Sequence, residues 1–142
     1  MASALKRLTA IAAAAVATIA LTGGPARATD GNNYVFNAGA IGSIGVIHIY
    51  DGDYTFGNYD QLLPQGEKSH EWFYTWYRTE GVYIGPGYCA DIYKRANDNQ
   101  SWGSKVVYEG GGSLPYMTNR YYNWMVVPFH KQPGLSCYAG PA

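Results

Sequence analysis

The chain has 142 residues, with ten basic and ten acidic side chains and an aromatic content of 15% that includes 14 Tyr and 4 Trp. This length suits one small domain. Because no basic patch stands out from the balanced charge, the sequence lacks the electrostatic footprint of a nucleic-acid-binding protein. We therefore expect a single domain whose partner is not a nucleic acid.

The first 28 residues have the three parts of a secretory signal peptide. Lys6 and Arg7 form a basic start, Leu8 to Leu21 is an uncharged apolar run, and Ala26-Arg27-Ala28 places small residues at the −3 and −1 positions of a cleavage site. The apolar run has 14 residues, fewer than the ~20 that a membrane-spanning helix needs. We expect residues 1–28 to be removed on export, leaving 29–142 as one secreted, extracellular domain without a membrane anchor. Removal takes three of the ten basic residues, so seven remain against ten acidic ones, a net charge near −3.

The chain after Tyr34 has the pattern of an all-β protein. Short segments alternate in polarity, Gly-rich turns separate them, and no segment keeps a 3.6-residue apolar period. The segments expected as strands are Val46 to Tyr50, Glu71 to Arg78, Gly81 to Ile84, Tyr88 to Lys94, Gly103 to Glu109 and Tyr121 to Phe129. Short strands of this kind predict a small sandwich or barrel.

The stretch from Thr79 to Arg95 is the most informative part of the domain. It contains two expected strands joined by Gly85-Pro86-Gly87. Proline presets the second position of a type II turn, and glycine accepts the positive φ of the third. Cys89 lies just past this turn, and Cys137 is the only other cysteine. In an exported chain the pair predicts one disulfide, which ties the C-terminal segment to the central hairpin.

The aromatic segment from Glu71 to Arg78 is the main candidate for a binding surface. As a strand it would place Trp72, Tyr74 and Trp76 on one face, with Tyr77 and Tyr83 nearby. Trp and Tyr offer large, rigid contact areas and dominate many binding surfaces. These five residues therefore either form a stacking platform for a glycan or a protein partner, or fill the core of a small domain.

Patterns that carry catalytic or metal chemistry are weak in this chain. His70-Glu71 begins like a zinc-binding HExxH motif, but Tyr74 stands where the second histidine is needed. Asp51 and Asp53 have the spacing of a carboxylate pair, but Gly52 between them favours a turn. Glu109, Arg120 and His130 form the best catalytic set, with the base, anion-binding and acid groups of a small ribonuclease. We expect no catalytic residue, metal ion or cofactor.

A loose internal repeat carries a resemblance to a known family. His48-Ile49-Tyr50 is followed by Gly57, Gly66 and Ser69, and Asp91-Ile92-Tyr93 is followed by Gly103, Gly112 and Ser113. From Ile44 to Phe129 this pattern resembles the Greek-key motifs of βγ-crystallin-type domains, whose secreted bacterial members include small proteinase inhibitors. The resemblance implies two Greek-key motifs. The calcium signature of that family is half present, because Asn97-Asp98 leads to Ser101 but Trp102 replaces the last serine.

A second resemblance rests on the blocks YDQLLPQGEKS and GVYIGPGYC. They are similar to segments of small secreted proteins of high-GC Gram-positive bacteria, and this similarity implies no activity.

Together these patterns favour a secreted, non-catalytic binding or proteinase-inhibitor-like module that acts on an extracellular protein or glycan. A carbohydrate-binding module with an aromatic platform is the second hypothesis, and a small secreted hydrolase is the third. An inhibitor should present a rigid loop braced by the disulfide, either Gly85 to Tyr88 or Asn97 to Gly103. A carbohydrate binder should expose aromatic rings, and an enzyme should show a cleft with converging polar groups.

Overall fold

The computed structural model describes residues 33–52, 57–112 and 114–139. The expected signal peptide, Asp53 and Ser113 lie outside these ranges. The elements in chain order are β1 Val35–Asn37, β2 Ile44–Ile47, β3 Gln61–Leu63, α1 Ser69–Trp72, β4 Gly81–Tyr83, β5 Tyr88–Arg95, β6 Val106–Glu109, β7 Tyr116–Met117, β8 Asn123–His130 and the 3₁₀ helix η1 Cys137–Ala139. The prediction of an all-β fold is confirmed.

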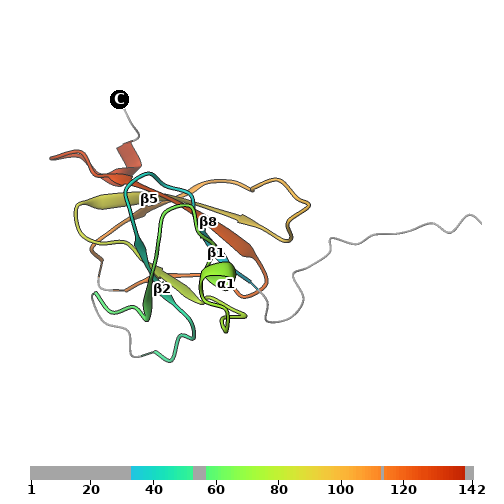
Figure 1. Ribbon diagram of the computed structural model, residues 1–142. Helices are drawn as coiled ribbons and strands as arrows, with labels where there is room; N and C mark the ends of the chain where they lie inside the picture. The colour runs from blue at the N-terminus through green and yellow to red at the C-terminus, as the bar shows by residue number, and fades with distance from the viewer. Residues whose placement is uncertain (1–32, 53–56, 113, 140–142) are drawn as a thin grey trace, which may run out of the picture.

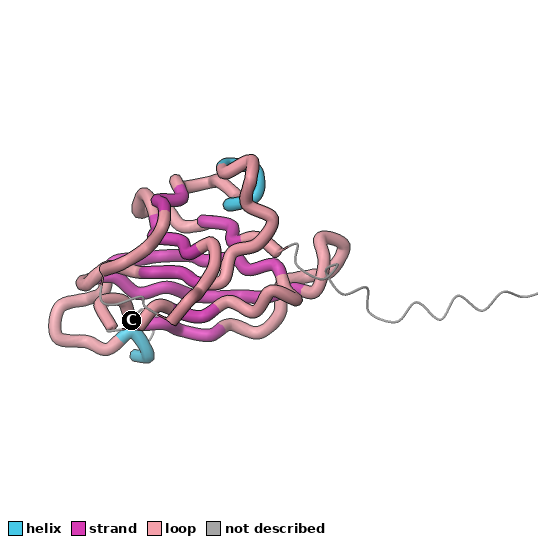
Figure 2. The backbone as a smooth tube through the Cα atoms, turned by 90° about the horizontal axis from the view of Figure 1, so that it is seen from below, coloured by secondary structure: helices cyan, strands magenta, loops and turns pink. Residues whose placement is uncertain are grey.

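The strands form two four-stranded sheets. Sheet A has the order β1-β8-β5-β6, and sheet B has the order β3-β2-β4-β7. The long antiparallel pair β5–β8 runs from Tyr88 opposite His130 to Arg95 opposite Asn123. β1 joins β8 in parallel, the one parallel pair among the described strands. Figure 1 shows β5 and β8 side by side across the molecule. In Figure 2 the two short helices lie on opposite sides of the strands.

The inner faces of the two sheets enclose the hydrophobic core. Sheet B contributes Ile44, Val46, Leu63 and Val82, and sheet A contributes Val35, Ala90, Ile92, Trp124 and Val126, with Ile84 from the turn after β4. Because side chains alternate along a strand, Cys89 and Asp91 lie on the opposite, outer face of sheet A from Ala90 and Ile92. The molecule is therefore a small sandwich, and Cys89 and Asp91 of β5 lie on the outer face of sheet A.

The two sheets exchange segments with each other. β2 lies between β3 and β4, and β5 lies in the same way between β6 and β8. β7, which comes between β6 and β8 in the sequence, pairs with β4 of sheet B. In return Lys68, which comes between β3 and β4, forms a bridge with Phe36 of β1 in sheet A. Besides β1, which is the first strand of the chain and belongs to sheet A, each half of the chain thus supplies one segment to the sheet formed mainly by the other half.

The turn at Gly85-Pro86-Gly87 agrees with its prediction, but the two strands that it joins do not pair as the expected hairpin. β4 lies in sheet B and β5 lies in sheet A, so the turn carries the chain from one sheet to the other. Gly87 has a φ of 82°, as the third position of a type II turn requires. The turn packs against Gly110, where an added Cβ would lie 2.3 Å from the carbonyl oxygen of Gly85. The backbone amide of Gly111 donates to the carbonyl oxygen of Ile84 at 2.9 Å. The loop after β6 therefore holds the turn closely.

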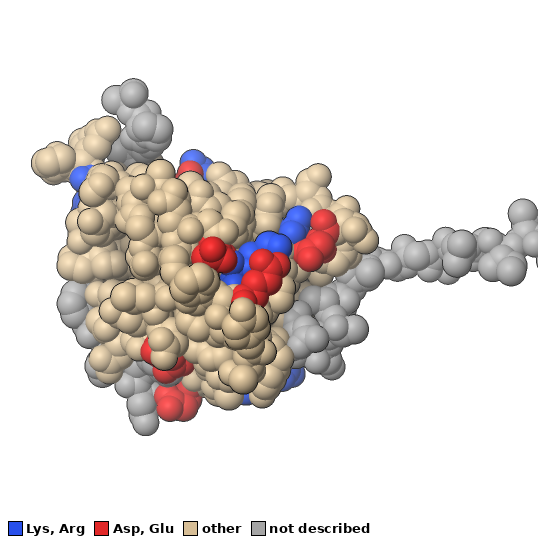
Figure 3. Space-filling view, in the orientation of Figure 1, with Lys and Arg blue, Asp and Glu red and all other residues tan. Residues whose placement is uncertain are grey.

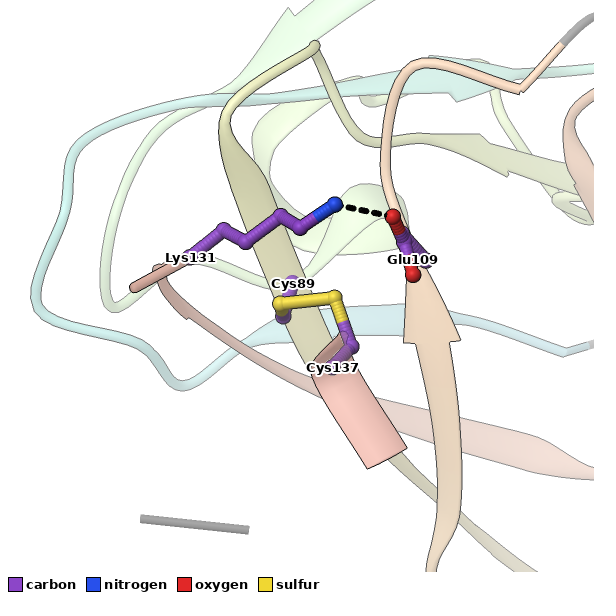
Figure 4. The surroundings of a disulfide bond; sticks show 4 residues. All are labelled: Cys89, Glu109, Lys131 and Cys137. Atoms are coloured by element: carbon purple, nitrogen blue, oxygen red, sulfur yellow. Dashed lines mark hydrogen bonds and ion pairs between the residues drawn. A yellow bond between two sulfur atoms is a disulfide. The ribbon is translucent and has the colours of Figure 1, made fainter. Parts of the chain in front are cut away.

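The predicted disulfide is present and anchors the end of the chain. Cys89 and Cys137 are bonded with their Cα atoms 5.7 Å apart. We call residues 131–139 the C-terminal arm. Beside the disulfide the ammonium of Lys131 forms an ion pair with the carboxylate of Glu109 (Figure 4). The backbone amide of Lys131 also donates to the carbonyl oxygen of Gly87 at 2.9 Å. These contacts tie the arm to the turn before β5 and to the neighbouring ends of β5 and β6.

The prediction of a strand from Glu71 to Arg78 is wrong. The chain forms α1 over Ser69–Trp72 and no strand until Gly81. The amide of Phe73 donates to the carbonyl oxygen of Ser69, and the amide of Trp76 donates to that of Phe73, so local bonds replace a sheet ladder. The Ser69 side chain is fully buried and contacts the Thr79 hydroxyl at 2.6 Å. This buried contact holds the segment in a helical turn, because tertiary packing overrides the β-propensity of its aromatic residues.

Strand β2 ends earlier than the alternation predicts, at Ile47 instead of Tyr50. The His48 amide donates to the Asp60 carboxylate at 2.7 Å, and the Tyr50 amide donates to the Glu80 carboxylate at 2.8 Å. Side-chain acceptors therefore replace strand partners at these positions. Because His48 lies outside β2, its side chain can contact Trp76 and Tyr77, which follow α1.

Candidate functional site

A groove beside α1 gathers aromatic and polar side chains from distant parts of the chain. It has a volume of ≈ 350 Å³, within the range of roughly 300–1,000 Å³ typical of small-ligand sites. We call it the aromatic groove, and its lining residues are Asn33, Tyr34, His70, Trp76, Tyr77, Asp98 and Asn123. Four of these seven residues carry rings, and the other three carry amide or carboxylate groups.

One wall of the groove is the stacked pair Tyr34 and His70. Their ring centroids are 4.6 Å apart with an interplanar angle of 29°. Tyr34 directly precedes β1, and its carbonyl oxygen accepts from the amide of Trp124 at 2.9 Å. His70 lies on α1, which is held against β1 because the Ser69 hydroxyl oxygen accepts from the amide of Val35 at 3.1 Å. Figure 1 shows α1 next to β1.

Trp76 and Tyr77 form a second wall and are supported from behind by His48. The rings of His48 and Trp76 stack with centroids 4.7 Å apart and an interplanar angle of 9°. Tyr77 meets His48 edge-on at 5.6 Å, and Phe73 packs against Trp76 at 4.4 Å. Tyr77 remains 52% exposed. The wall therefore presents ring surface that is held in place and still reaches solvent.

Asp98 supplies the charged group of the groove. It lies in the loop between β5 and β6, and the Nη2 of Arg95 contacts its Oδ1 at 2.6 Å. The Tyr34 hydroxyl donates to the same oxygen, as does the Asn123 amide at 3.1 Å. Among the described residues all of these bonds use Oδ1. The other carboxylate oxygen, Oδ2, is therefore left as an acceptor, and the side chain is 62% exposed.

The groups around Asp98 set its protonation state. The hydrogen bond from Tyr34 and then the charge of Arg95 lower the pKa of Asp98, so it is ionised at neutral pH. Burial raises the pKa of Tyr34, which keeps its hydroxyl protonated as a donor. Partial burial lowers the pKa of His70. A general acid for glycoside cleavage needs a raised carboxyl pKa, so Asp98 is suited to accepting hydrogen bonds and unsuited to protonating a substrate.

The loop that carries Asp98 is rigidly built. The guanidinium of Arg95 lies over the Trp102 ring at 4.2 Å. The amide of Asn99 donates to the side chain of Asn97 at 3.0 Å, and the amide of Gly103 donates to the carbonyl oxygen of Lys94 at 2.8 Å.

Figure 3 shows that charged side chains of both signs gather near α1, while most of this face carries none.

The predicted aromatic residues are not brought together as one platform. Trp76 and Tyr77 line the aromatic groove, whereas Trp72 and Tyr74 are exposed beside it without lining it. Tyr74 is 95% exposed. Tyr83 is buried on β4 and stacks on Tyr59 at 6.0 Å, away from the groove lining. The expected shared face of Trp72, Tyr74 and Trp76 is lost because α1 replaces the strand.

The sequence patterns missed most of the groove. His70 and Asp98 appeared only in incomplete metal motifs, and no local pattern singled out Tyr34 or Asn123. The pairing of β1 with β8 places Val35 opposite Trp124, which brings the residues preceding both positions close together. Only that long-range pairing identifies Tyr34 and Asn123 as neighbours.

The proposed ribonuclease set does not converge. Glu109 pairs with Lys131, and His130 packs on Tyr88 at 4.9 Å, both at one end of sheet A. Arg120 precedes β8 and His130 ends it, so the whole of Asn123–His130, a strand about 25 Å long at the usual rise, lies between them in the chain. Asp51 is described and exposed, but its candidate partner Asp53 is not described.

Neither a metal-binding cluster nor a membrane-spanning helix is present among the described residues. No cluster of three or more His, Cys, Asp or Glu side chains in this part of the chain is arranged to hold a metal ion. The described ranges also contain no helix with the length and apolar character needed to cross a membrane. Comparison of the chain with protein-family models, with curated proteins and with solved structures gives no match in any of the three.

Proposed function

We propose that this chain is a secreted, non-catalytic binding module and that the aromatic groove takes a glycan. The observation that carries the proposal is the combination of aromatic walls with an ionised carboxylate, Asp98, whose Oδ2 is open to a ligand. A sugar ring has apolar faces, which pack on aromatic side chains, and hydroxyl groups at its edge, which donate to carboxylate oxygens. The groove offers both kinds of contact within one small volume.

The rigidity of the groove supports a binding role. Asp98 is held by three donors, and Trp76 is braced between His48 and Phe73. Ordering flexible side chains weakens binding, so groups that are held before the ligand arrives improve affinity. A glycan that enters would meet ring surfaces and an acceptor already in position.

The topology supports the proposed relationship to βγ-crystallin-type domains. In a Greek key the chain makes consecutive antiparallel strands and a further strand that returns beside an earlier one. Here β2 and β5 are each flanked by the next strand and by a returning strand, and the two halves exchange a segment. We interpret this as two Greek-key motifs. Because stable disulfides form in oxidising compartments, the Cys89–Cys137 bond together with the N-terminal pattern supports export.

Soluble oligosaccharides test the proposal directly. The purified domain is titrated calorimetrically with chitin-, cellulose-, xylan- and mannan-derived oligosaccharides. At least one series should bind, and Trp76→Ala should weaken that binding about 30-fold, as expected for a central aromatic anchor. Tyr77→Ala should also weaken it. Tyr138→Ala is the matched control, because Tyr138 is 72% exposed on the C-terminal arm. Absence of binding to every series would exclude this glycan proposal.

A proteinase inhibitor is the second candidate, favoured by the braced loop 96–103 and the exposed Tyr74. The brace is the Arg95–Asp98 pair with Trp102, because the disulfide lies at the other end of β5. The expectation that the disulfide braces the loop from Asn97 to Gly103 is therefore wrong. Of the two loops considered, Gly85 to Tyr88 is the one that lies beside Cys89. A panel of secreted metallo- and serine proteinases, assayed with wild type, Tyr74→Ala and Gln100→Ala, tests this candidate. Inhibition weakened by these variants but unchanged by Trp76→Ala would favour it over the glycan module.

A further inference from the structure

A second hollow lies on the outer face of sheet A, beneath the C-terminal arm. Its volume is ≈ 450 Å³, and it is lined by Cys89, Asp91, Lys105, Val107, Phe129, His130, Gln132, Leu135, Ser136, Cys137 and Tyr138. None of these residues lines the aromatic groove. We call it the arm pocket. Its size falls within the range of small-molecule sites, roughly 300–1,000 Å³.

The strand register explains how the pocket floor forms. Cys89 lies opposite Phe129 on one side, and Asp91 lies opposite Val107 on the other. Because side chains alternate, these four residues share the outer face, while Ala90 turns into the core. The floor therefore consists mainly of Phe129, Val107 and the disulfide.

The C-terminal arm forms the opposite side of the pocket. The disulfide and the Lys131–Glu109 ion pair hold the arm against the ends of β5 and β6 (Figure 4). The arm places Leu135 and Tyr138 at the pocket, and these side chains are 42% and 72% exposed. Apolar surface is thus present on both sides of a hollow that reaches solvent.

The charges around the pocket are already paired. The ammonium of Lys105 lies 3.2 Å from the Oδ2 of Asp91. Lys131, at the base of the arm, pairs with Glu109. These two pairs carry no net charge, so neither leaves an unpaired ion for a charged ligand. Gln132 and Ser136 also line it and supply uncharged hydrogen-bonding groups.

We propose that the arm pocket binds an uncharged small amphiphile, with its apolar body between Phe129 and Leu135 and its hydrogen-bonding end toward Gln132 or Ser136. An apolar body gains from contact with both sides of the pocket. A charged head would have to break an existing ion pair or remain unpaired, and both are unfavourable. The site is independent of the aromatic groove and of the glycan proposal.

Three probes with the same chain length test the ligand class. The intact disulfide-bonded domain is titrated calorimetrically with 1-octanol, octanoate and octylammonium. Octanol should bind at least about tenfold more tightly than either ion, because only the ions must bring an unpaired charge to the pocket. Hexanol should bind more weakly than octanol by about fourfold per methylene removed. Equal or tighter binding of either ion would overturn the proposed class, as would no detectable octanol binding.

Variants locate the binding. Leu135→Glu places a charge in the pocket on an exposed arm residue and should reduce octanol affinity at least about tenfold. Leu62→Glu is the matched control, because Leu62 is 49% exposed on β3 of the other sheet. Octanol should also shift the methyl NMR signals of Val107 and Leu135. If Leu135→Glu binds octanol like wild type, or if Trp76→Ala abolishes binding, the arm pocket is not the site.

Discussion

The hydroxyl of Tyr34 hydrogen-bonds to the carboxylate of Asp98, 64 residues further along the chain. The bond joins the start of β1 to the loop between β5 and β6, and Arg95 and Asn123 reach the same carboxylate oxygen. It therefore links one aromatic wall of the groove to its charged group. This contact explains why the groove keeps its shape although its residues come from four separate segments.

Replacing Tyr34 with Phe should separate this bond from the packing of the ring. The stacking on His70 is retained, but Asp98 loses a donor, so the pKa of Asp98 should rise toward its ordinary value. We expect unfolding stability to fall by about 1 kcal/mol, a modest loss because water screens an exposed carboxylate. Urea denaturation and an NMR titration of Asp98 measure the two effects. Tyr138→Phe, on the exposed arm, should change neither quantity.

The same bond predicts a pH dependence. The pKa of Asp98 is lower in the folded protein than in the unfolded chain, so its stabilising contribution is fully present above the unfolded value of about 3.9. It is lost as the pH falls through the lower folded value. The stability difference between wild type and Tyr34→Phe should therefore be constant near neutral pH and shrink below about pH 4. Urea midpoints measured across this range check it, and a difference that grows on acidification would contradict the assignment.

Ser69→Ala should destabilise the protein and disturb the aromatic groove. Ser69 is fully buried, and its hydroxyl bonds to the amide of Val35 and to the hydroxyl of Thr79. Removal leaves buried polar groups without a partner, which costs about 1–3 kcal/mol. It also loosens α1, so the His70 ring should lose its fixed stacking on Tyr34. Thermal unfolding and the NMR signals of His70 measure both effects, and Ser104→Ala, on an exposed residue, should be nearly neutral.

Gly110→Ala should be strongly destabilising, whereas Gly112→Ala should be tolerated. An added Cβ at Gly110 lies 2.3 Å from the Gly85 carbonyl oxygen and 2.8 Å from Ile84, so the turn before β5 must move. Such overpacking typically costs about 1–3 kcal/mol. At Gly112 the nearest atoms are 3.8 Å away. Urea denaturation of the two variants compares the same chemical change at neighbouring positions, and similar losses would contradict the tight packing of the turn.

Loss of the disulfide should release the C-terminal arm. The double variant Cys89→Ala/Cys137→Ala removes the link without leaving a free thiol, and we expect stability to fall by about 2–5 kcal/mol. Because the arm base then keeps the Lys131–Glu109 pair and the Lys131–Gly87 backbone bond but loses its covalent link, trypsin should cleave after Lys131 well before it attacks β5 or β8. Mass spectrometry of timed digests identifies the cleavage. Wild type should resist it, and the denatured unreduced wild type should show no free thiol.

Local sequence determined the turn before β5 and strands β2, β4, β5, β6 and β8, whereas it did not predict β1, β3 or β7. The Gly85-Pro86-Gly87 turn, the alternation along Tyr88 to Lys94 and the two cysteines each act through neighbouring residues or a single covalent link, so they can be interpreted without the fold. The same patterns predicted an all-β sandwich or barrel with one disulfide, and the structure is a sandwich with that disulfide. The positive φ of Gly87 follows from the same local chemistry.

Only the tertiary structure decided what the aromatic segment does. Trp72 to Tyr77 has the composition of a strand, but the burial of Ser69 against Val35 and Thr79 bends the chain into α1. The groove then depends on contacts between Tyr34, His70 and Asp98, which strand pairing brings together across long sequence separations. Local propensity is a small energy per residue, whereas a buried hydrogen-bond network is lost as a unit, so the long-range contacts prevail.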